Sequence, residues 1–342
     1  MSSTTRPRTA ADPASAEFVR LTDPFRRELL AYCYRMTASV HEAEDLVQET
    51  YLLAWRGYGE FEGRSSLRTW LYRIATNVCL KALERAARRP LPSGLAGPGD
   101  PDAAPDPRQP EMPWLQPIPD AMFGSVPADP AATVASRHSM RLALVAVLQQ
   151  VPPRQRAVFL LRDVLAWRAA EVAELFGATT ASVNSALQRA RTQLAQADLA
   201  EDEVVEPTDP DQRALVDEFA AAFQNADITT LMRLLTQDAV LEMPPIPTWF
   251  AGREHIGRFL TGRLRTPGAM RMIPTSANGQ PAFAVYTHND EGDRHAHAIV
   301  LLTLATAGIA RITMFHDPDL FSVFGLPATT PPPTRGSSPP RP

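Results

Sequence analysis

Residues 168–194 have the sequence RAAEVAELFGATTASVNSALQRARTQL, in which a short helical pattern stops at Gly177 and a longer one begins near Thr180. Glycine commonly follows the last turn of a helix, because it adopts a left-handed conformation at little cost. Two helices joined by such a short turn form a helix-turn-helix, whose second helix enters the major groove of DNA. The segment therefore predicts a DNA-binding unit.

The second of these helices has an apolar stripe and a polar face. The stripe comprises Val183, Ala186 or Leu187, Ala190 and Leu194, at helical spacing. The groups left outside are hydroxyls, amides and guanidiniums suited to base edges and phosphates: Thr180, Ser182, Asn184, Ser185, Gln188, Arg189 and Arg191. A solvated helix face has a similar composition, so this face alone leaves both interpretations open.

The net charge of the whole chain is −4, which by itself argues against a nucleic-acid partner. The charges are unevenly distributed, however. Residues 62–89 contain seven basic and two acidic residues, and residues 134–197 contain eight basic and three acidic residues. Acidic residues gather in 90–133, which has 12 prolines, and in 198–209, which has six carboxylates and no cation. The positive charge of 134–197 therefore favours the DNA-binding interpretation.

Proline density and periodicity predict a multidomain chain. Linkers are expected at 90–133 and 198–209, and disordered ends at 1–16 and 327–342. Helical spacings fill 17–89 and 134–197, the latter as helices over Val134–Gln150, Pro153–Val164 and Arg168–Phe176. Residues 210–326 pass from helical patterns at 211–224, 228–235 and 253–264 to strand-like runs at 269–275, 282–288, 294–306 and 308–316. Two all-α units thus precede an α+β unit with an antiparallel sheet.

The two cysteines, Cys33 and Cys79, lie in apolar helical patterns, as do Leu46 and Leu53, and we expect all four side chains in helix cores. Without a framework of paired cysteines, a reducing compartment is favoured. The N-terminal residues show no apolar signal sequence, and no run of about 18 apolar residues occurs. We therefore expect a cytoplasmic protein with no membrane contact.

Long stretches of the chain resemble a known family. AEDLVQETYLLAW (43–55) and FEGRSSLRTWLYRIATNVCLKALERAARR (61–89) look like region 2 of the extracytoplasmic-function (ECF) group of sigma-70 factors. LQQVPPRQRAVFLLRDVLAWRAAEVAELFGATTASVNSALQRARTQL (148–194) looks like their region 4. The resemblance implies a region 2 helical bundle, a region 4 helix-turn-helix and a subunit that directs bacterial RNA polymerase to promoters. It implies no catalysis, cofactor or metal.

The same resemblance implies roles for particular residues. Asp45, Gln48 and Glu49 would dock on the clamp helices of the polymerase. The minus-10 element would be melted and read by Phe61, Arg64, Ser65, Ser66, Arg68, Trp70, Arg73, Asn77 and Lys81. The minus-35 element would be read by the polar face of the helix that begins at Thr180. Many ECF factors have lysine or arginine where this chain has Asn184 and Ala186, so its contacts to phosphates differ.

The C-terminal part resembles that of ECF factors that carry a SnoaL-like domain. The resemblance rests on PWLQPIPD (113–120), VNSALQRAR (183–191), EMPPIPTWFAGREHIGRFL (242–260) and HDPDLFSVFGLP (316–327). Such a domain is an α+β cone whose curved sheet encloses a pocket. Apolar and aromatic residues are the expected lining of a small-molecule pocket, and the candidates are Met243, Trp249, Phe250, Phe259, Tyr286, His297 and Phe315.

Histidines in the same part suggest a second class of function. His295 and His297 alternate along a predicted strand, so with Asp293 or Asp317 they are candidates for acid-base chemistry or metal binding. A structural role is favoured, because no third ligand stands at metal-binding spacing. The alternative to a sigma factor is therefore a domain that senses or converts a small molecule, fused to a DNA-binding module.

The first linker contains a segment that we expect to be anchored. Trp114, Leu115, Pro117, Pro119 and Asp120 stand in an otherwise polar linker, and an exposed aromatic side chain there would be unfavourable. The hypothesis is that the C-terminal domain docks on the two helical units through this segment and regulates how readily they engage polymerase.

Overall fold

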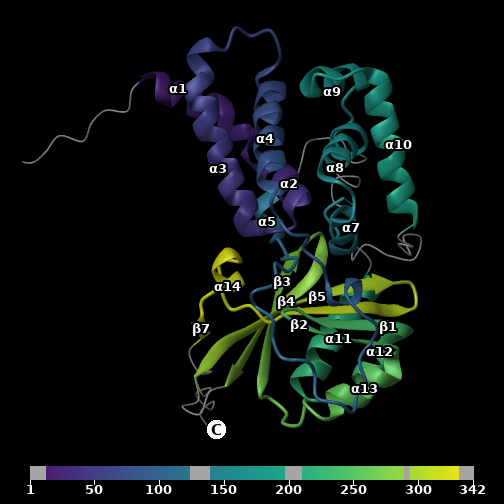
Figure 1. Cartoon of the computed structure of the whole chain (residues 1–342). Helices are drawn as coiled ribbons and strands as arrows, with labels where there is room; N and C mark the ends of the chain where they lie inside the picture. The colour runs from purple at the N-terminus through teal and green to yellow at the C-terminus, as the bar shows by residue number, and fades with distance from the viewer. Residues whose placement is uncertain (1–12, 124–138, 197–209, 289–292, 331–342) are drawn as a thin grey trace, which may run out of the picture.

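The computed structural model describes residues 13–123, 139–196, 210–288 and 293–330. The first helical unit consists of α1 (Pro13–Thr22), α2 (Arg26–Thr37), α3 (Val40–Gly57) and α4 (Leu67–Leu83), as Figure 1 shows. Two serines begin its longer helices: the Ser39 hydroxyl accepts from the Glu42 amide, and the Ser66 hydroxyl from the Thr69 amide. The two buried cysteines face each other between α2 and α4, with their Sγ atoms 3.6 Å apart.

The second helical unit consists of α7 (Leu142–Leu148), α8 (Pro153–Phe159) with a π-helical turn (Leu160–Val164), α9 (Ala169–Phe176) and α10 (Thr180–Gln196). The expected helix over Val134–Gln150 is therefore shorter, and residues 134–138 of it lie outside the described residues. Ser139 and Met140 form a turn instead. Their polar atoms bind other parts of the chain, because the Ser139 hydroxyl accepts from Arg35 and the Met140 carbonyl from Asn278.

The C-terminal domain has three longer helices and a curved sheet. The helices are α11 (Pro210–Gln224), α12 (Ile228–Leu234) and α13 (Arg253–Thr261). The strands are β1 (Leu235–Met243), β2 (Ile246–Ala251), β3 (Met270–Ala277), β4 (Gln280–His288), β5 (Arg294–Ala305), β6 (Gly308–Phe315) and β7 (Thr329–Thr330), with a short α14 (Leu320–Val323) before β7.

The sheet is mixed, which corrects the expectation of an antiparallel sheet. Its order is β2-β1-β6-β5-β4-β3, β7 pairs with β5, and β1 runs parallel to β6 while the other pairs are antiparallel. The sequence patterns missed β2, because its run IPTWFA contains a proline and lacks alternation. Pairing of β7 also means that residues 329–330 of the expected disordered tail belong to the sheet.

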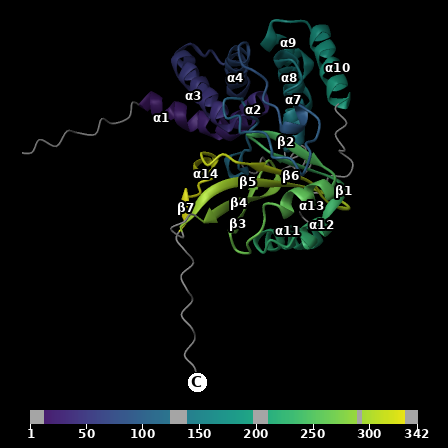
Figure 2. The ribbon, with the colours of Figure 1, turned by 60° about the horizontal axis from the view of Figure 1, so that its bottom comes forward.

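The two faces of the sheet have different partners. Phe283, Val285 and Val300 point toward α11–α13 and share a core with Phe219. Tyr286 and the residues around it on the opposite face share a core with the helical units. Figures 1 and 2 show the sheet between α11–α13 on one side and the helical units on the other. This arrangement places both helical units on the C-terminal domain.

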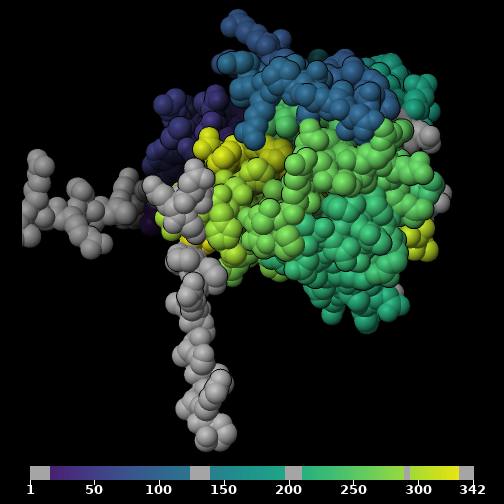
Figure 3. Space-filling view, turned by 90° about the horizontal axis from the view of Figure 1, so that it is seen from below, coloured from purple at the N-terminus to yellow at the C-terminus, as the bar shows by residue number. Residues whose placement is uncertain are grey.

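The expected linker is packed over most of its described length. From Pro90 it runs extended along the C-terminal domain, with a 3-10 turn at Pro92–Gly94 and a short α5 at Asp120–Phe123. The Gly99 amide donates to the Trp249 carbonyl and the Gln109 amide to the Pro245 carbonyl, both at 2.8 Å. Figure 3 shows the segment in blue as a band across the C-terminal domain. No helix among the described residues is long and apolar enough to cross a bilayer.

Candidate nucleic-acid interface

Helix α10 has the two faces that its sequence predicted. Val183, Leu187 and Ala190 are buried against α8 and α9, and Ala186 is half-buried. Gly177 ends α9 with a φ of 58°, and the Thr179 hydroxyl accepts from the Ser182 amide to begin α10. All seven residues of the predicted face are exposed: Thr180, Ser182, Asn184, Ser185, Gln188, Arg189 and Arg191. The Arg191 guanidinium also forms a bidentate pair with Asp163 at 2.7 Å, so its orientation is fixed.

The predicted minus-10 residues lie on α4 and the loop before it, with different surroundings. Trp70 is half-buried, and its ring packs on Phe61 at 4.9 Å between centroids. Ser66, Asn77 and Lys81 are exposed, and Ser65 is half-buried. Arg64 pairs with Glu62 in the loop. The loop and one side of α4 thus present an aromatic pair beside cations, as single-stranded DNA binding requires.

Besides Arg64, the other two arginines of this set also have partners inside the chain, on other helices. Arg68 forms a bidentate pair with Glu28 of α2, at 2.9 Å. Arg73 lies 3.2 Å from Glu174 of α9, and next to it the Tyr72 and Trp167 rings meet edge to face at 5.4 Å. Helix α4 therefore contacts the helix-turn-helix unit directly, a feature that no pattern in the sequence indicated.

The predicted polymerase-docking residues Asp45, Gln48 and Glu49 are all exposed on α3. Beside them α3 exposes Leu52 (58% exposed), Leu53 and Trp55 (40% each). The expectation that Leu53 faces the core is wrong, because Ala54 occupies the buried position of that turn. Exposed apolar side chains next to acids indicate a protein-binding surface, and the sequence signal for it was the run TYLLAW, with more apolar residues than one helix face can bury.

The linker residues are buried between the helical units and the C-terminal domain. Leu115 is fully buried, and Trp114, 8% exposed, donates its indole N–H to the Gln109 carbonyl at 2.7 Å. Pro117 and Pro119 are also buried, the latter in a bridge to Ala277. The Asp120 carboxylate accepts from the Gly279 amide at 2.8 Å.

A hairpin turn that the sequence reasoning missed connects all parts of the chain. Asn278 is fully buried at the β3–β4 turn with a φ of 56°. Its Nδ2 donates to the Tyr34 hydroxyl of α2 (2.8 Å) and to the Met140 carbonyl before α7 (2.7 Å). Its Oδ1 accepts from the amide of Ile118 in the linker (3.0 Å). The Asn-Gly dipeptide, a strong hairpin signal, was the clue available in the sequence.

The predicted pocket of the C-terminal domain does not form from its seven residues. Met243, Phe250 and Phe259 lie in the core under α11–α13, where Phe250 and Phe259 stack at 4.3 Å. Tyr286 and Phe315 lie on the opposite face of the sheet. Trp249 donates to the Ala96 carbonyl of the linker. Alternation along the strands separates these side chains, so the prediction of one shared pocket is wrong.

The histidine of that set, His297, pairs with His316 rather than with an acid. The two rings meet edge to face at 4.9 Å. Burial lowers the pKa of His316 to about 3, with further lowering by His297 and Arg108, and burial and Arg108 also lower the pKa of His297. Both imidazoles are thus neutral near pH 7. Among the described residues no cluster of three metal-binding side chains forms.

Comparison with known proteins agrees with the geometry. Residues 21–89 match the Sigma-70 region 2 family, residues 141–194 the Sigma-70 region 4 family and residues 216–312 the SnoaL-like domain family. The ECF RNA polymerase sigma factor SigG of Mycobacterium tuberculosis is 48% identical over 94% of this chain and 86% of its own length. SigJ of the same species is 29% identical over 72% of this chain and 73% of its own.

A solved structure has the same fold. The crystal structure of the M. tuberculosis sigma factor SigJ superposes with a TM-score of 0.59 at 24% identity, over 91% of this chain and 99% of that one. It shows that two helical sigma units followed by an α+β domain form one known architecture. By its identity to SigG across nearly its whole length, the chain belongs to the ECF sigma factors of the sigma-70 family, with a C-terminal SnoaL-like domain.

Proposed function

We propose that this protein binds core RNA polymerase in the cytoplasm and directs initiation at promoters with minus-35 and minus-10 elements. The observation that carries the proposal is the combination of an exposed acidic and apolar face on α3 with two separate surfaces suited to DNA, on α4 and α10. A repressor that binds only duplex DNA needs the surface on α10, but it needs neither the face on α3 nor the surface on α4. The polymerase makes the RNA, so this chain performs no covalent step.

The polymerase contact is assigned to one face of α3. Asp45, Gln48 and Glu49 supply hydrogen-bond acceptors and charge, and the neighbouring Leu52 and Trp55 supply apolar area. Leu52→Glu should reduce co-purification with core polymerase by tenfold or more, since it would place a charge in the apolar centre of the contact. Leu95→Glu, at another exposed leucine, is the control. Equal loss in both variants would contradict the assignment.

The DNA contacts are assigned to α4 and α10. Trp70 and Phe61 would stack on unpaired bases of the minus-10 strand, with Arg64, Ser65, Ser66, Arg68, Arg73, Asn77 and Lys81 along its backbone. On α10, the exposed Gln188 and Arg189 would read base edges of the minus-35 element. Transcription in vitro from promoters selected with the purified holoenzyme tests both assignments. Failure of the chain to associate with core enzyme would refute the proposed function.

The C-terminal domain is proposed to regulate this activity. Promoter elements about 25 base pairs apart are separated by about 85 Å at ~3.4 Å per base pair, yet α4 contacts α9 through Arg73 and Glu174. The arrangement seen here therefore cannot place both helical units on their elements at once. The linker and Asn278 hold it together, so the domain favours the inactive state. Truncation after Leu199 tests this in a promoter-directed assay; unchanged polymerase binding, promoter choice and output would refute it.

A further inference from the structure

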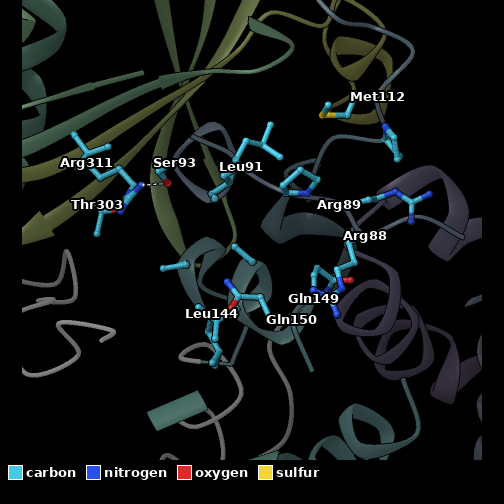
Figure 4. Close-up of a pocket in the computed structure, with 18 of the residues that line it drawn as sticks. Arg88, Arg89, Leu91, Ser93, Met112, Leu144, Gln149, Gln150, Thr303 and Arg311 are labelled. Atoms are coloured by element: carbon cyan, nitrogen blue, oxygen red, sulfur yellow. Dashed lines mark hydrogen bonds between the residues drawn. The ribbon is translucent and has the colours of Figure 1, made fainter. Parts of the chain in front are cut away.

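A large cavity lies where the helical units, the linker and the C-terminal domain meet. Its walls come from residues 87–95, residues 108–113, α7 and the strands β1, β5 and β6, and its volume is about 1420 Å³. Figure 4 shows Arg88 and Arg89 on one side of it and Thr303 and Arg311 on the other. Ordinary small-molecule sites measure roughly 300–1,000 Å³, so there is room for a ligand of nucleotide size with water around it.

The wall of this cavity is strongly positive. It contains five arginines and two carboxylates, which are Arg88, Arg89, Arg108, Arg141, Arg311, Glu111 and Asp238. Arg89 pairs with Glu42 and Arg311 with the buried Glu242, each at 2.7 Å. Arg88 and Arg108 are exposed to the solvent and form no ion pair with any residue in the described ranges. Two guanidinium groups are therefore available to an anion.

The positive charge acts on the groups around it. Burial lowers the pKa of Arg156, next to the cavity, to about 10, and the charges of Arg88 and Arg89 contribute to the lowering. Arg108 lies at another part of the wall, and its positive charge helps to lower the pKa values of His297 and His316.

The remaining wall is apolar, with Leu91, Leu95, Met112, Leu144 and Val147 among its residues. Guanidinium groups match phosphate oxygens in a bidentate geometry, and apolar side chains suit an organic group attached to the phosphates. We propose that the cavity binds a metabolite with two or more linked phosphates on an organic group. Arg88 and Arg108, which form no ion pair in the described ranges, contact the phosphates.

Binding here would have a consequence for the arrangement of the molecule. Because the walls come from all three folded parts, a ligand stabilises the arrangement in which they are in contact. Loss of transcription on ligand binding is the expected result, and this step rests on the proposed function. Binding itself does not, so a direct binding measurement separates the two.

The test uses the full-length protein with ATP and sodium tripolyphosphate as probes, in calorimetry at constant ionic strength. We expect one site per chain, tighter binding of ATP than of tripolyphosphate, and at least tenfold weaker binding in the double variant Arg88→Gln, Arg108→Gln. Arg213→Gln, at an exposed arginine of α11, should bind as the wild type does.

Three results would overturn the proposal. The first is an absence of saturable binding at 1 mM probe, or an equal loss of affinity in Arg213→Gln. The second is equal affinity for ATP and tripolyphosphate, which would show that the organic group contributes nothing to binding. The third is competition by a single-stranded DNA oligonucleotide in the wild type but not in the double variant, which would assign the cavity to the path of the promoter strand.

Discussion

In the proposed function Arg73 has two partners that exclude each other, Glu174 and the minus-10 strand. In this structure its guanidinium pairs with Glu174; the Glu174 side chain is largely exposed and that of Arg73 is 42% exposed, so the pair contributes at most about 1 kcal/mol. Glu174→Ala should therefore leave the melting temperature almost unchanged and raise promoter binding, because it frees Arg73. Arg73→Ala breaks the same ion pair but should lower promoter binding about tenfold. Fluorescence anisotropy of the holoenzyme on a minus-10 DNA fork measures both. The same direction of change in the two variants would contradict this account.

His316 makes stability depend on pH. Its folded pKa of about 3 lies below that of an unfolded histidine, through burial, His297 and Arg108, and the neighbouring Asp317 has a pKa raised by burial. Folding thus favours the neutral ring. Its contribution to the free energy of unfolding is complete above about pH 6.5. That contribution is lost as the pH falls toward 3, at up to about 1.4 kcal/mol per pH unit. Urea unfolding between pH 7 and 5 should show this slope in the wild type.

Two variants test whether His316 causes this slope: one removes the His316 ring nitrogen atoms, and the other changes a different histidine as a control. His316→Phe keeps a ring against His297 and removes the titrating group, so the slope should become shallower. His255→Gln, at an exposed position on α13, should keep the wild-type slope. Identical slopes in all three proteins would show that other groups determine the pH dependence.

At the scale of elements, the β3–β4 hairpin holds α2, the linker and the segment before α7 together through the hydrogen bonds of Asn278. Asn278→Gly keeps the left-handed backbone accessible but removes two donated and one accepted hydrogen bond, leaving the Ile118 amide and the Met140 carbonyl without partners. Buried groups left unpaired in this way cost roughly 2–4 kcal/mol together. We expect a lower melting temperature and a larger radius of gyration by small-angle scattering. Unchanged values of both would refute the role of the hairpin.

Periodicity predicted the elements that follow one simple repeat and missed those that do not. Helices such as α10 and strands such as β4 were expected close to their observed ends, because one face of each is buried. The polar face of α10 followed from the same reasoning about faces, whereas the candidate residues on α3 and α4 came from the resemblance to ECF sigma factors. The parallel pairing of β1 with β6, and the division of the predicted pocket between two faces of the sheet, depend on contacts between distant segments. Local patterns contain no information about those contacts.

At the scale of the whole molecule, the acidic linker packs on both the C-terminal domain and the first helical unit. Its composition predicted a linker anchored only at residues 114–120, but its prolines allow an extended chain whose amides also pair with the C-terminal domain at Gly99 and Gln109. Gln116 binds α2 through its backbone and the start of α3 through its side chain, as the Tyr34 hydroxyl donates to its carbonyl and the Ser39 hydroxyl to its Oε1. The linker therefore fixes where the two helical units sit, and it must detach in part before they can separate.

Separation of the helical units should be required for activity, and a cross-link can test it. In the double variant Arg73→Cys, Glu174→Cys, a short cleavable bismaleimide reagent would join α4 to α9, whose side chains meet at 3.2 Å. The native Cys33 and Cys79 are fully buried and should not react. The cross-linked protein should lose promoter-directed transcription, and cleavage of the reagent should restore the activity of the uncross-linked variant. Full activity of the cross-linked protein would mean that the observed arrangement is itself the one that binds promoters.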